Sequence, residues 1–291
     1  MLKLSSKIIS ALILGLPLIG CGVPTGTEAR IPVTTNTPTT FETPAKTQTL
    51  APAVSETPQT VDSGWVFVRS GLERRGITLR NAADEPVEDI TILRIDPDGF
   101  AFDVAYDRLG KELEAWQSET GAEVIVNGGY FRKEQGEYIP DGLIVAGGET
   151  IGESYGDFAG MFAVGESGPE LRWLRSIPYN PSEPLRAALQ CFPILIKPGG
   201  QIGFPAESED GIRARRTVIG QDRGGRILFL IASQGFFTLR QLSVFLHETD
   251  LELDVAMNLD GGPSSGMVIA DPLEIIPAEY VLPIVFVIRS K

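Results

Sequence analysis

Histidine and cysteine are nearly absent from this chain, whose 291 residues contain one histidine, His247, and two cysteines, Cys21 and Cys191. One imidazole cannot build a zinc or iron site that needs several histidine ligands. A calcium site made of carboxylates stays open, although no EF-hand-like loop is present. We therefore predict neither a bound metal nor a cofactor. His247 follows a predicted apolar helix stripe, where a surface or half-buried position is the simpler interpretation and catalysis is the alternative.

Positive charge is also scarce, because 25 lysines and arginines face 38 acidic residues and give a formal net charge of −13. This balance argues against nucleic acid as a partner and against electrostatic adhesion to anionic lipid. Apolar runs long enough to span a membrane are missing, and no internal repeat stands out. These absences leave a protein whose only membrane-directed segment is at its start.

The first residues have the pattern of an export signal. Lys3 and Lys7 supply positive charge, and the apolar run 8–20, of 13 residues, is too short to span a bilayer. The run ends in Leu-Ile-Gly-Cys, which resembles a bacterial lipobox, so we predict a lipoprotein signal peptide at 1–20 and acylation of Cys21. Several acyl chains on one residue give stable anchoring. The predicted location is extracytoplasmic, anchored to the cell membrane or outer membrane, with a plain secretory signal as the alternative.

A segment rich in threonine and proline, residues 21–63, follows the predicted cleavage site. It has too few large apolar residues to offset its ordering entropy, so we predict a disordered tether. Residues 64–291 are numerous enough to bury a stable core and form the predicted domain. With Cys21 acylated, Cys191 is the only thiol left. No intrachain disulfide can then form, and we predict Cys191 as a buried, small apolar side chain.

Short β-like runs separated by glycine or proline dominate the body of the chain. Residues 88–95 alternate apolar and polar positions, as do residues 100–106, which is typical of half-buried strands. Residues 227–232 are apolar throughout, as in a central strand covered on both faces. Further strands are predicted at 123–127, 143–146, 161–164, 193–197, 216–220, 254–259 and 281–288.

Only two helices are predicted. The first has Leu109, Leu113 and Trp116 at helical spacing, with Gly121 placed to end it. The second begins at Thr238, where a glutamine three residues on completes a capping-box pattern. Many strands and few helices predict an α+β fold with a mixed, mainly antiparallel sheet core and a few packed helices.

One carboxylate stands at the end of a predicted strand, directly before two glycines and two serines, in the segment Asn258-Leu259-Asp260-Gly261-Gly262-Pro263-Ser264-Ser265. Glycine lacks a Cβ, so a ligand can approach this backbone closely. Hydroxyl and free N–H groups within a few residues of a carboxylate are typical of sugar or phosphate sites. A tight turn that needs glycine for its positive φ angles is the alternative.

The same segment matches the G-x-S-x-G pattern of the nucleophile elbow at 262–266. That motif needs a strand before the serine, a helix after it and a histidine later in the chain. Here His247 comes earlier, and residues 267–270 predict a strand. We therefore do not expect a serine hydrolase.

Three other segments carry polar groups at strand ends. Asn127-Gly128-Gly129-Tyr130-Phe131 mirrors the Asp260 segment, and its asparagine can bind a sugar hydroxyl or phosphate, with a turn as the alternative. Asp141 precedes another glycine. Arg215 and Arg216 enter a predicted strand, so they point to opposite faces and one of them can reach a bound phosphate. Solvated strand charges are the alternative for this pair.

Taken together and in this order, these segments resemble the phosphodiester glycosidase domain family over roughly residues 85–290. At Pro263 the chain departs from the family, which commonly has a third glycine there, and proline removes one N–H donor. The matching pieces are Asn127-Gly128-Gly129-Tyr130-Phe131, Asp141-Gly142, Pro193-Ile194-Leu195, Arg216-Thr217-Val218-Ile219-Gly220, Thr238-Leu239, Asn258-Leu259-Asp260-Gly261-Gly262 and Ser264-Ser265.

The resemblance implies hydrolysis of a sugar-1-phosphodiester in a cell-envelope or extracellular glycan. A phosphate leaving group is already a stable anion, so anion stabilisation matters more than a general acid. On this interpretation Asp260 is a base or nucleophile, Arg216 holds the phosphate and Asp141 is the second carboxylate. The residues assigned to substrate binding are Asn127, Gly128, Gly129, Asn258, Gly261, Gly262, Ser264 and Ser265.

Two alternatives to this function remain open. One is a non-catalytic lipoprotein that binds a glycan or sugar phosphate. The other is an ordinary glycoside hydrolase that acts on envelope polysaccharide and uses Asp260 with a distant glutamate. The sequence does not set the oligomeric state.

Overall fold

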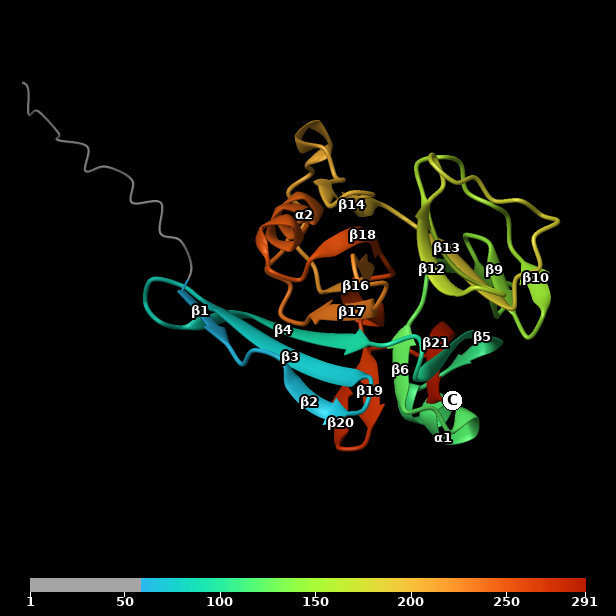
Figure 1. Cartoon of the computed structure of the whole chain (residues 1–291), viewed down its shortest axis with the longest axis horizontal. Helices are drawn as coiled ribbons and strands as arrows, with labels where there is room; N and C mark the ends of the chain where they lie inside the picture. The colour runs from blue at the N-terminus through green and yellow to red at the C-terminus, as the bar shows by residue number, and fades with distance from the viewer. Residues whose placement is uncertain (1–58) are drawn as a thin grey trace, which may run out of the picture. The chain divides into compact units, whose positions relative to one another are not determined.

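The computed structural model describes residues 59–291, drawn in colour in Figure 1. The predicted signal peptide, Cys21 and most of the predicted tether lie outside the described residues. Residues 59–291 belong to one compact unit. In the part that the structure describes, no helix is both long and apolar enough to cross a membrane. The first strand, β1 (Gln59–Asp62), pairs with residues 77–80, so the sheet begins ahead of the predicted domain start at 64.

The remaining elements follow in chain order. They are β2 (Val66–Arg69), β3 (Leu72–Arg80), β4 (Pro86–Ile95), β5 (Phe100–Lys111), α1 (Leu113–Thr120), β6 (Val124–Asn127), β7 (Phe131–Glu134), β8 (Glu137–Pro140), β9 (Ile144–Ala146), β10 (Glu149–Ile151), β11 (Gly160–Gly165), β12 (Gly168–Trp173), β13 (Ala187–Cys191), β14 (Ile194–Lys197), β15 (Gln201–Ile202), the 3₁₀ turn η1 (Ala206–Ser208), β16 (Arg216–Asp222), β17 (Ile227–Ala232), α2 (Leu239–Glu248), β18 (Leu253–Asn258), the 3₁₀ turn η2 (Gly262–Ser264), β19 (Met267–Ala270), β20 (Leu273–Ile276) and β21 (Leu282–Ser290).

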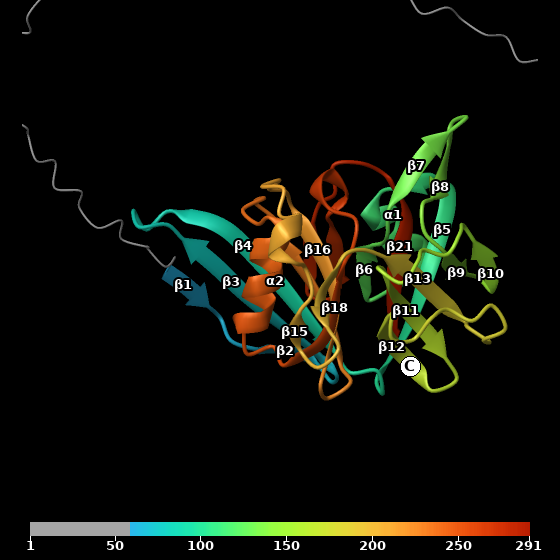
Figure 2. The same cartoon turned by 90° about the horizontal axis from the view of Figure 1, so that it is seen from above.

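The structure is predominantly β, which corrects the predicted α+β class. A nine-stranded sheet has the order β1-β3-β4-β17-β16-β18-β14-β15, with β2 paired to β3. Two five-stranded sheets have the orders β10-β9-β13-β11-β12 and β20-β19-β6-β21-β5, and β7 and β8 form a projecting hairpin (Figure 2). The pairings among the described strands are all antiparallel, which confirms the mainly antiparallel core, although no parallel pair of the predicted mixed sheet is found among them.

Three phenylalanines join the three large sheets in one core. Phe286 of β21 lies with its ring centroid 5.1 Å from Phe229 of β17 and 5.3 Å from Phe162 of β11. All three side chains are fully buried. Each strand comes from a different sheet, so this contact fixes the sheets against one another. Tilted and edge-on aromatic pairs of this kind add to the hydrophobic burial of their rings.

The two helices begin and end partly as predicted. Thr238 forms the predicted capping box at the start of α2, and its Leu242 is buried against the nine-stranded sheet beside β14 (Figure 1). Gly121, in the left-handed conformation with a φ of 62°, ends α1 as predicted. Leu109, however, lies in β5 and is 66% exposed, because β5 continues to Lys111 in its pairing with β21.

Two further predictions concern single side chains. Cys191 is completely buried in β13 and forms no disulfide with any described residue, as its apolar neighbours predicted. His247 lies on the exposed side of α2, where its Nδ1 is 2.9 Å from the Gly200 carbonyl oxygen. Neither of them supplies a nucleophile or a base to the site described next.

Candidate active site

Three strand ends meet at the predicted site. The start of β16 lies beside the end of β18, because Val218 pairs with Asn258 and the Leu259 N–H donates to the Thr217 carbonyl at 2.9 Å. The end of β6 joins them from a different sheet, since the Asp260 N–H donates to the Gly128 carbonyl at 3.1 Å. Segments that are about 130 residues apart in the sequence are thus held together by backbone hydrogen bonds.

Asn127 lies beneath this junction and connects its parts. Its Nδ2 donates to the Asp260 carbonyl at 2.8 Å, and its Oδ1 accepts from Thr217 Oγ1 at 2.8 Å and from the Gly266 N–H at 3.1 Å. The side chain is completely buried. Its donor and acceptor are therefore used within the protein, which corrects the prediction that Asn127 contacts substrate. It positions Asp260 instead.

Asp260 carries the half-buried carboxylate of the site. Burial raises the pKa of Asp260 to about 6, and the negative charge of Asp141 acts in the same direction. Hydrogen bonds from Ser264 and from the Gly261 N–H, 2.9 Å from Oδ1, oppose the shift. The group therefore changes protonation close to neutral pH, in the range where a general base is most effective.

Arg216 is a buried cation without a carboxylate partner. Its Nε donates to the Phe237 carbonyl at 3.3 Å and its Nη2 donates to the Ile212 carbonyl at 2.7 Å. Within residues 59–291 no carboxylate oxygen lies within 4.0 Å of its guanidinium. Burial lowers the pKa of Arg216, but a guanidinium stays protonated in proteins. Because neutral carbonyls alone hold it, its charge is available to an anion.

Arg215 points away from Arg216, as adjacent strand positions predict. Its Nη2 donates to the carbonyls of Ser265 at 2.7 Å and Pro277 at 2.8 Å. Arg215 thus ties together two loops on the other side of β16, and Arg216 is the member of the pair that is buried beside the site.

Tyr130 and Asn258 form a polar pair next to Asp260 and Arg216. The Tyr130 hydroxyl donates to the Phe192 carbonyl at 2.9 Å and accepts from Asn258 Nδ2 at 2.9 Å. Burial raises the pKa of Tyr130, and the charges of Asp260 and Arg216 act on it in opposite directions. Asn258 Oδ1 is buried and lacks a hydrogen-bond partner among the described residues. The site therefore contains one unused acceptor.

Asp141 directly follows β8, and its negative charge acts on Asp260. Its backbone N–H donates to the Tyr130 carbonyl at 2.9 Å, and its Oδ1 accepts from Arg132 Nη1 at 2.7 Å. The side chain is 37% exposed and forms an ion pair with Arg132. Asp141 is thus close enough to influence Asp260 electrostatically while its own charge is already paired.

The four predicted glycines have different roles. A Cβ on Gly128 would lie 2.6 Å from Ile284 Cγ2, and one on Gly261 would lie 2.8 Å from the Arg215 carbonyl oxygen. These two glycines are required for close packing of the strand ends. A Cβ on Gly129 would lie 3.3 Å from the Gln190 carbonyl oxygen, whereas Gly262 has a positive φ of 57° and open space around it.

The two predicted serines are buried in and beside η2. Ser264 is 6% exposed, and its hydroxyl stabilises the ionised form of Asp260. Ser265 is completely buried and its Oγ has no hydrogen-bond partner among the described residues. Strand β19 follows, as predicted, so the helix that a nucleophile elbow needs is absent from this position.

An aromatic wall borders the site, and sequence analysis did not find it. The ring centroid of Phe192 lies 5.0 Å from that of Tyr130, 5.1 Å from Tyr155 and 5.4 Å from Phe158. These residues come from three separate segments of the chain, so no local pattern in the sequence brings them together. The one available signal was Tyr130 itself, which follows the two glycines after Asn127.

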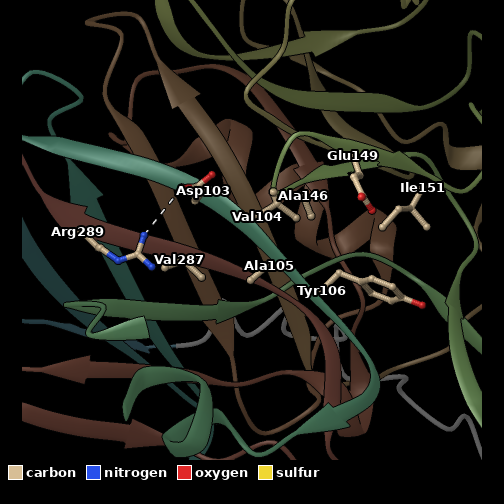
Figure 3. A pocket seen from close by; sticks show the side chains of 10 residues that line it. Asp103, Val104, Ala105, Tyr106, Ala146, Glu149, Ile151, Val287 and Arg289 are labelled. Carbon is tan, nitrogen blue, oxygen red and sulfur yellow. Dashed lines mark ion pairs between the residues drawn. The ribbon is translucent and has the colours of Figure 1, made fainter. Parts of the chain in front are cut away.

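A cavity of about 380 Å³ lies elsewhere, between β5, β21 and the β9–β10 hairpin. Figure 3 shows its charged groups, in which Asp103 and Arg289 form an ion pair at 3.9 Å and Glu149 stands apart from them. None of the predicted site residues lines this cavity. The candidate chemistry therefore belongs to the strand junction around Asp260.

Comparisons with known proteins give a family and a fold. The sequence model of a family described as phosphodiester glycosidase matches residues 120–281, which is more than half of the chain. No curated protein matches the sequence.

Two solved structures have a similar fold. The catalytic domain of zebrafish N-acetylglucosamine-1-phosphodiester α-N-acetylglucosaminidase, auto-inhibited by its pro-peptide, is 18% identical with a TM-score of 0.58 over 81% of this chain and 89% of that one. A hypothetical protein from Synechocystis is 14% identical with a TM-score of 0.52 over 82% of this chain and 65% of that one.

Proposed function

The chain belongs to the phosphodiester glycosidase family, and from that membership we propose that it hydrolyses a sugar-1-phosphodiester, with Asp260 as base and Arg216 as phosphate ligand. The observation that carries the proposal is the pairing of a half-buried carboxylate, whose pKa is about 6, with a buried guanidinium that has no carboxylate partner among the described residues. The first group can activate water, and the second can stabilise an anionic leaving group.

In the proposed reaction, water attacks the anomeric carbon and transfers a proton to the Asp260 carboxylate. The bond between that carbon and the phosphate oxygen breaks, and its electron pair leaves with the phosphate. A free sugar and a phosphomonoester result. Arg216 stabilises the charge that develops on the leaving group, and donors already in place for such a charge contribute strongly to catalysis.

We also propose that the protein acts outside the cytoplasm, anchored by acylated Cys21, on a glycan of the cell envelope or its surroundings. The lipobox-like end of the first apolar run supports the anchor, and the Thr/Pro-rich segment after it supports a tethered domain. Mass spectrometry of the exported protein tests this part, because an acylated N-terminal Cys21 is expected and an unmodified Cys21 would contradict it.

The activity is tested with the full chain and a panel of sugar-1-phosphodiesters, including nucleotide sugars and alkyl-phosphate sugars. Free reducing sugar is the readout, and Asp260→Asn is the variant. We expect release by the wild type and none by the folded variant. Release by both would remove Asp260 from the mechanism. Saturable binding by the wild type without release would favour a glycan-binding lipoprotein.

A matched pair of arginine variants tests the phosphate site. Arg216→Gln is expected to lower kcat/KM by roughly 10²–10³-fold, since it removes a preorganised cation from the leaving group. Arg215→Gln, one residue earlier, removes contacts to the Ser265 and Pro277 carbonyls and is expected to lower Tm while kcat/KM changes little. Equal kinetic losses in the two variants would contradict the assignment, and so would full activity of Arg216→Gln on the phosphodiester.

A further inference from the structure

A second cavity adjoins the site, between β12 at the edge of one five-stranded sheet and β14 of the nine-stranded sheet. Its volume is about 300 Å³, and its lining includes Phe158, Trp173, Arg175, Pro193, Lys197 and Ser208. Two of these residues are cations and two are aromatic. No residue predicted from the sequence to bind substrate lines it.

Two walls of this cavity continue into the Asp260 site. On one side, the Pro193 carbonyl accepts from the Asn258 N–H at 2.9 Å, and the preceding carbonyl accepts from the Tyr130 hydroxyl. On the other side, Ser208 precedes Glu209, whose negative charge acts on Arg216. The hydrogen bonds at the Pro193 and Phe192 carbonyls thus link the lining of the cavity to the polar groups of the site.

The cations of the cavity are held against an indole ring. Arg175 Cζ lies 5.1 Å and Lys197 Nζ lies 5.6 Å from the ring centroid of Trp173. In residues 59–291, no carboxylate oxygen lies within 4.0 Å of Lys197 Nζ, whereas Arg175 Nε contacts Asp157 at 3.0 Å. A π face orients a cation without neutralising it, so Lys197 keeps its full charge for a ligand.

The net charge of the chain indicates which kind of ligand suits these cations. A protein with a formal net charge of −13 offers a general environment that disfavours anions. Lys197, which has no carboxylate partner among the described residues, and Arg175, which is paired with Asp157, border one cavity and are a local exception to this environment. Charge complementarity indicates an acidic occupant, and the flanking Phe158 and Trp173 add apolar surface for the atoms that connect its acidic groups.

We propose that this cavity is a subsite for a second acidic group, carried by the part of the substrate beyond the scissile phosphate. The proposal rests on the proposed function in one respect, since Arg216 is taken to hold the first phosphate. It identifies the substrate class as a phosphodiester whose leaving group has a further phosphate or carboxylate. Lys197 and Arg175 contact that group, and they increase affinity without taking part in bond breaking.

Isothermal titration calorimetry of the full chain tests the subsite with two probes, inorganic phosphate and tripolyphosphate. Phosphate can occupy Arg216 alone, whereas tripolyphosphate is long enough to carry a second charge beyond it. We expect tripolyphosphate to bind the wild type at least about tenfold more tightly. Lys197→Ala should lose that advantage and keep the phosphate affinity, and Arg216→Gln should weaken both probes.

Arg80→Ala is the matched control, because it removes a cation from β3 near the opposite edge of the nine-stranded sheet. It should leave both affinities unchanged. Equal loss of tripolyphosphate affinity in Lys197→Ala and Arg80→Ala would overturn the subsite, since only net charge would then matter. Equal affinity of the wild type for both probes would also overturn it.

The hydrolysis panel separates this proposal from the proposed function. Turnover of sugar-1-phosphodiesters without a Lys197-dependent preference would leave the function standing and remove the subsite. A Lys197-dependent preference for tripolyphosphate without turnover would leave the subsite standing and remove the hydrolase. With carboxylate-bearing and phosphate-bearing leaving groups in the panel, a lower KM for one of them identifies which acidic group the cavity accepts.

Discussion

Asp260 determines how the activity should depend on pH. Its folded-state pKa is about 6, and in the proposed mechanism the carboxylate form is the base. We therefore expect kcat/KM to be low at pH 4.5, to rise through a midpoint near pH 6 and to level off above pH 7. Steady-state kinetics across this range measure the midpoint. A profile that is flat from pH 4.5 to 7.5 would contradict the role of Asp260 as base.

The ionised form of Asp260 should also lower the free energy of unfolding. Burial raises the pKa of Asp260 from 3.8 to about 6, so the folded state binds the proton more tightly than the unfolded state does. The stability contributed by the protonated form is present below the unfolded pKa and is lost as pH rises through the folded pKa. Ionised Asp260 thus destabilises the fold at neutral pH by up to about 3 kcal/mol.

Asp260→Asn should remove this cost. We expect the variant to be more stable than the wild type at pH 8 by about 1–3 kcal/mol, with the difference nearly gone at pH 4. Urea denaturation at the two pH values measures it. A variant that is less stable than the wild type at pH 8 would show that the ionised carboxylate makes net favourable contacts in the folded state, which contradicts the predicted cost of its burial.

At the scale of elements, the loop before α2 connects a buried carboxylate to Arg216, the proposed phosphate ligand. Glu88 of β4 is completely buried, and it accepts from the N–H groups of Gln234 at 2.6 Å and Phe236 at 2.9 Å. The next residue, Phe237, supplies the carbonyl that accepts from Arg216 Nε. Glu88 is thus a positioning residue for Arg216.

Glu88→Gln should loosen this loop. An amide replaces one acceptor oxygen with a donor that faces a backbone N–H, which costs about 1–3 kcal/mol of stability. We expect KM for the phosphodiester to rise roughly three- to tenfold as Arg216 loses its position. Glu114→Gln, on the exposed face of α1, is the matched control and should change neither value. A stability loss without any change in KM would leave Glu88 a purely structural residue.

The helices and strands also show which sequence patterns were sufficient to predict local structure. The capping box at Thr238 and the glycine end of α1 depend on neighbouring residues, and both predictions are confirmed. Leu109 had helical spacing, yet pairing of β5 with β21 extends the strand through it. Helix propensity and residue spacing depend only on the segment itself. The conformation at Leu109 is instead set by the hydrogen-bonded pairing of β5 with β21, whose residues come about 175 positions later in the sequence.

In the site, too, the features set by neighbouring residues were predicted, whereas those set by distant residues were not. The strand-end pattern led to the prediction of Asp260 and Arg216 as site residues, because a polar residue beside an apolar run is visible locally. The burial of Asn127 was not visible, since its partners Thr217 and Gly266 are about 90 and 140 residues away. The α+β class fits only loosely, because two short helices contribute little beside the strands of three large sheets.

At the scale of the whole molecule, one aromatic contact joins the three large sheets within their shared core. Phe286→Ala would remove a fully buried ring that touches both Phe229 and Phe162. We expect a loss of about 3–5 kcal/mol and a single unfolding transition, measured by urea denaturation with two optical probes. Phe67→Ala, at a ring that is 72% exposed, is the matched control and should change stability by less than about 0.5 kcal/mol. Two separate transitions would contradict a shared core.

The position of bond cleavage is the central claim, and hydrolysis in ¹⁸O-labelled water tests it directly. If Asp260 activates water against the anomeric carbon while Arg216 holds the departing phosphate, the label must enter the released sugar, and ³¹P NMR must show an unlabelled phosphomonoester. Label in the phosphomonoester would mean that water attacks phosphorus. The protein would then be a phosphodiesterase that breaks the bond between phosphorus and the sugar oxygen, and not the bond between the anomeric carbon and that oxygen.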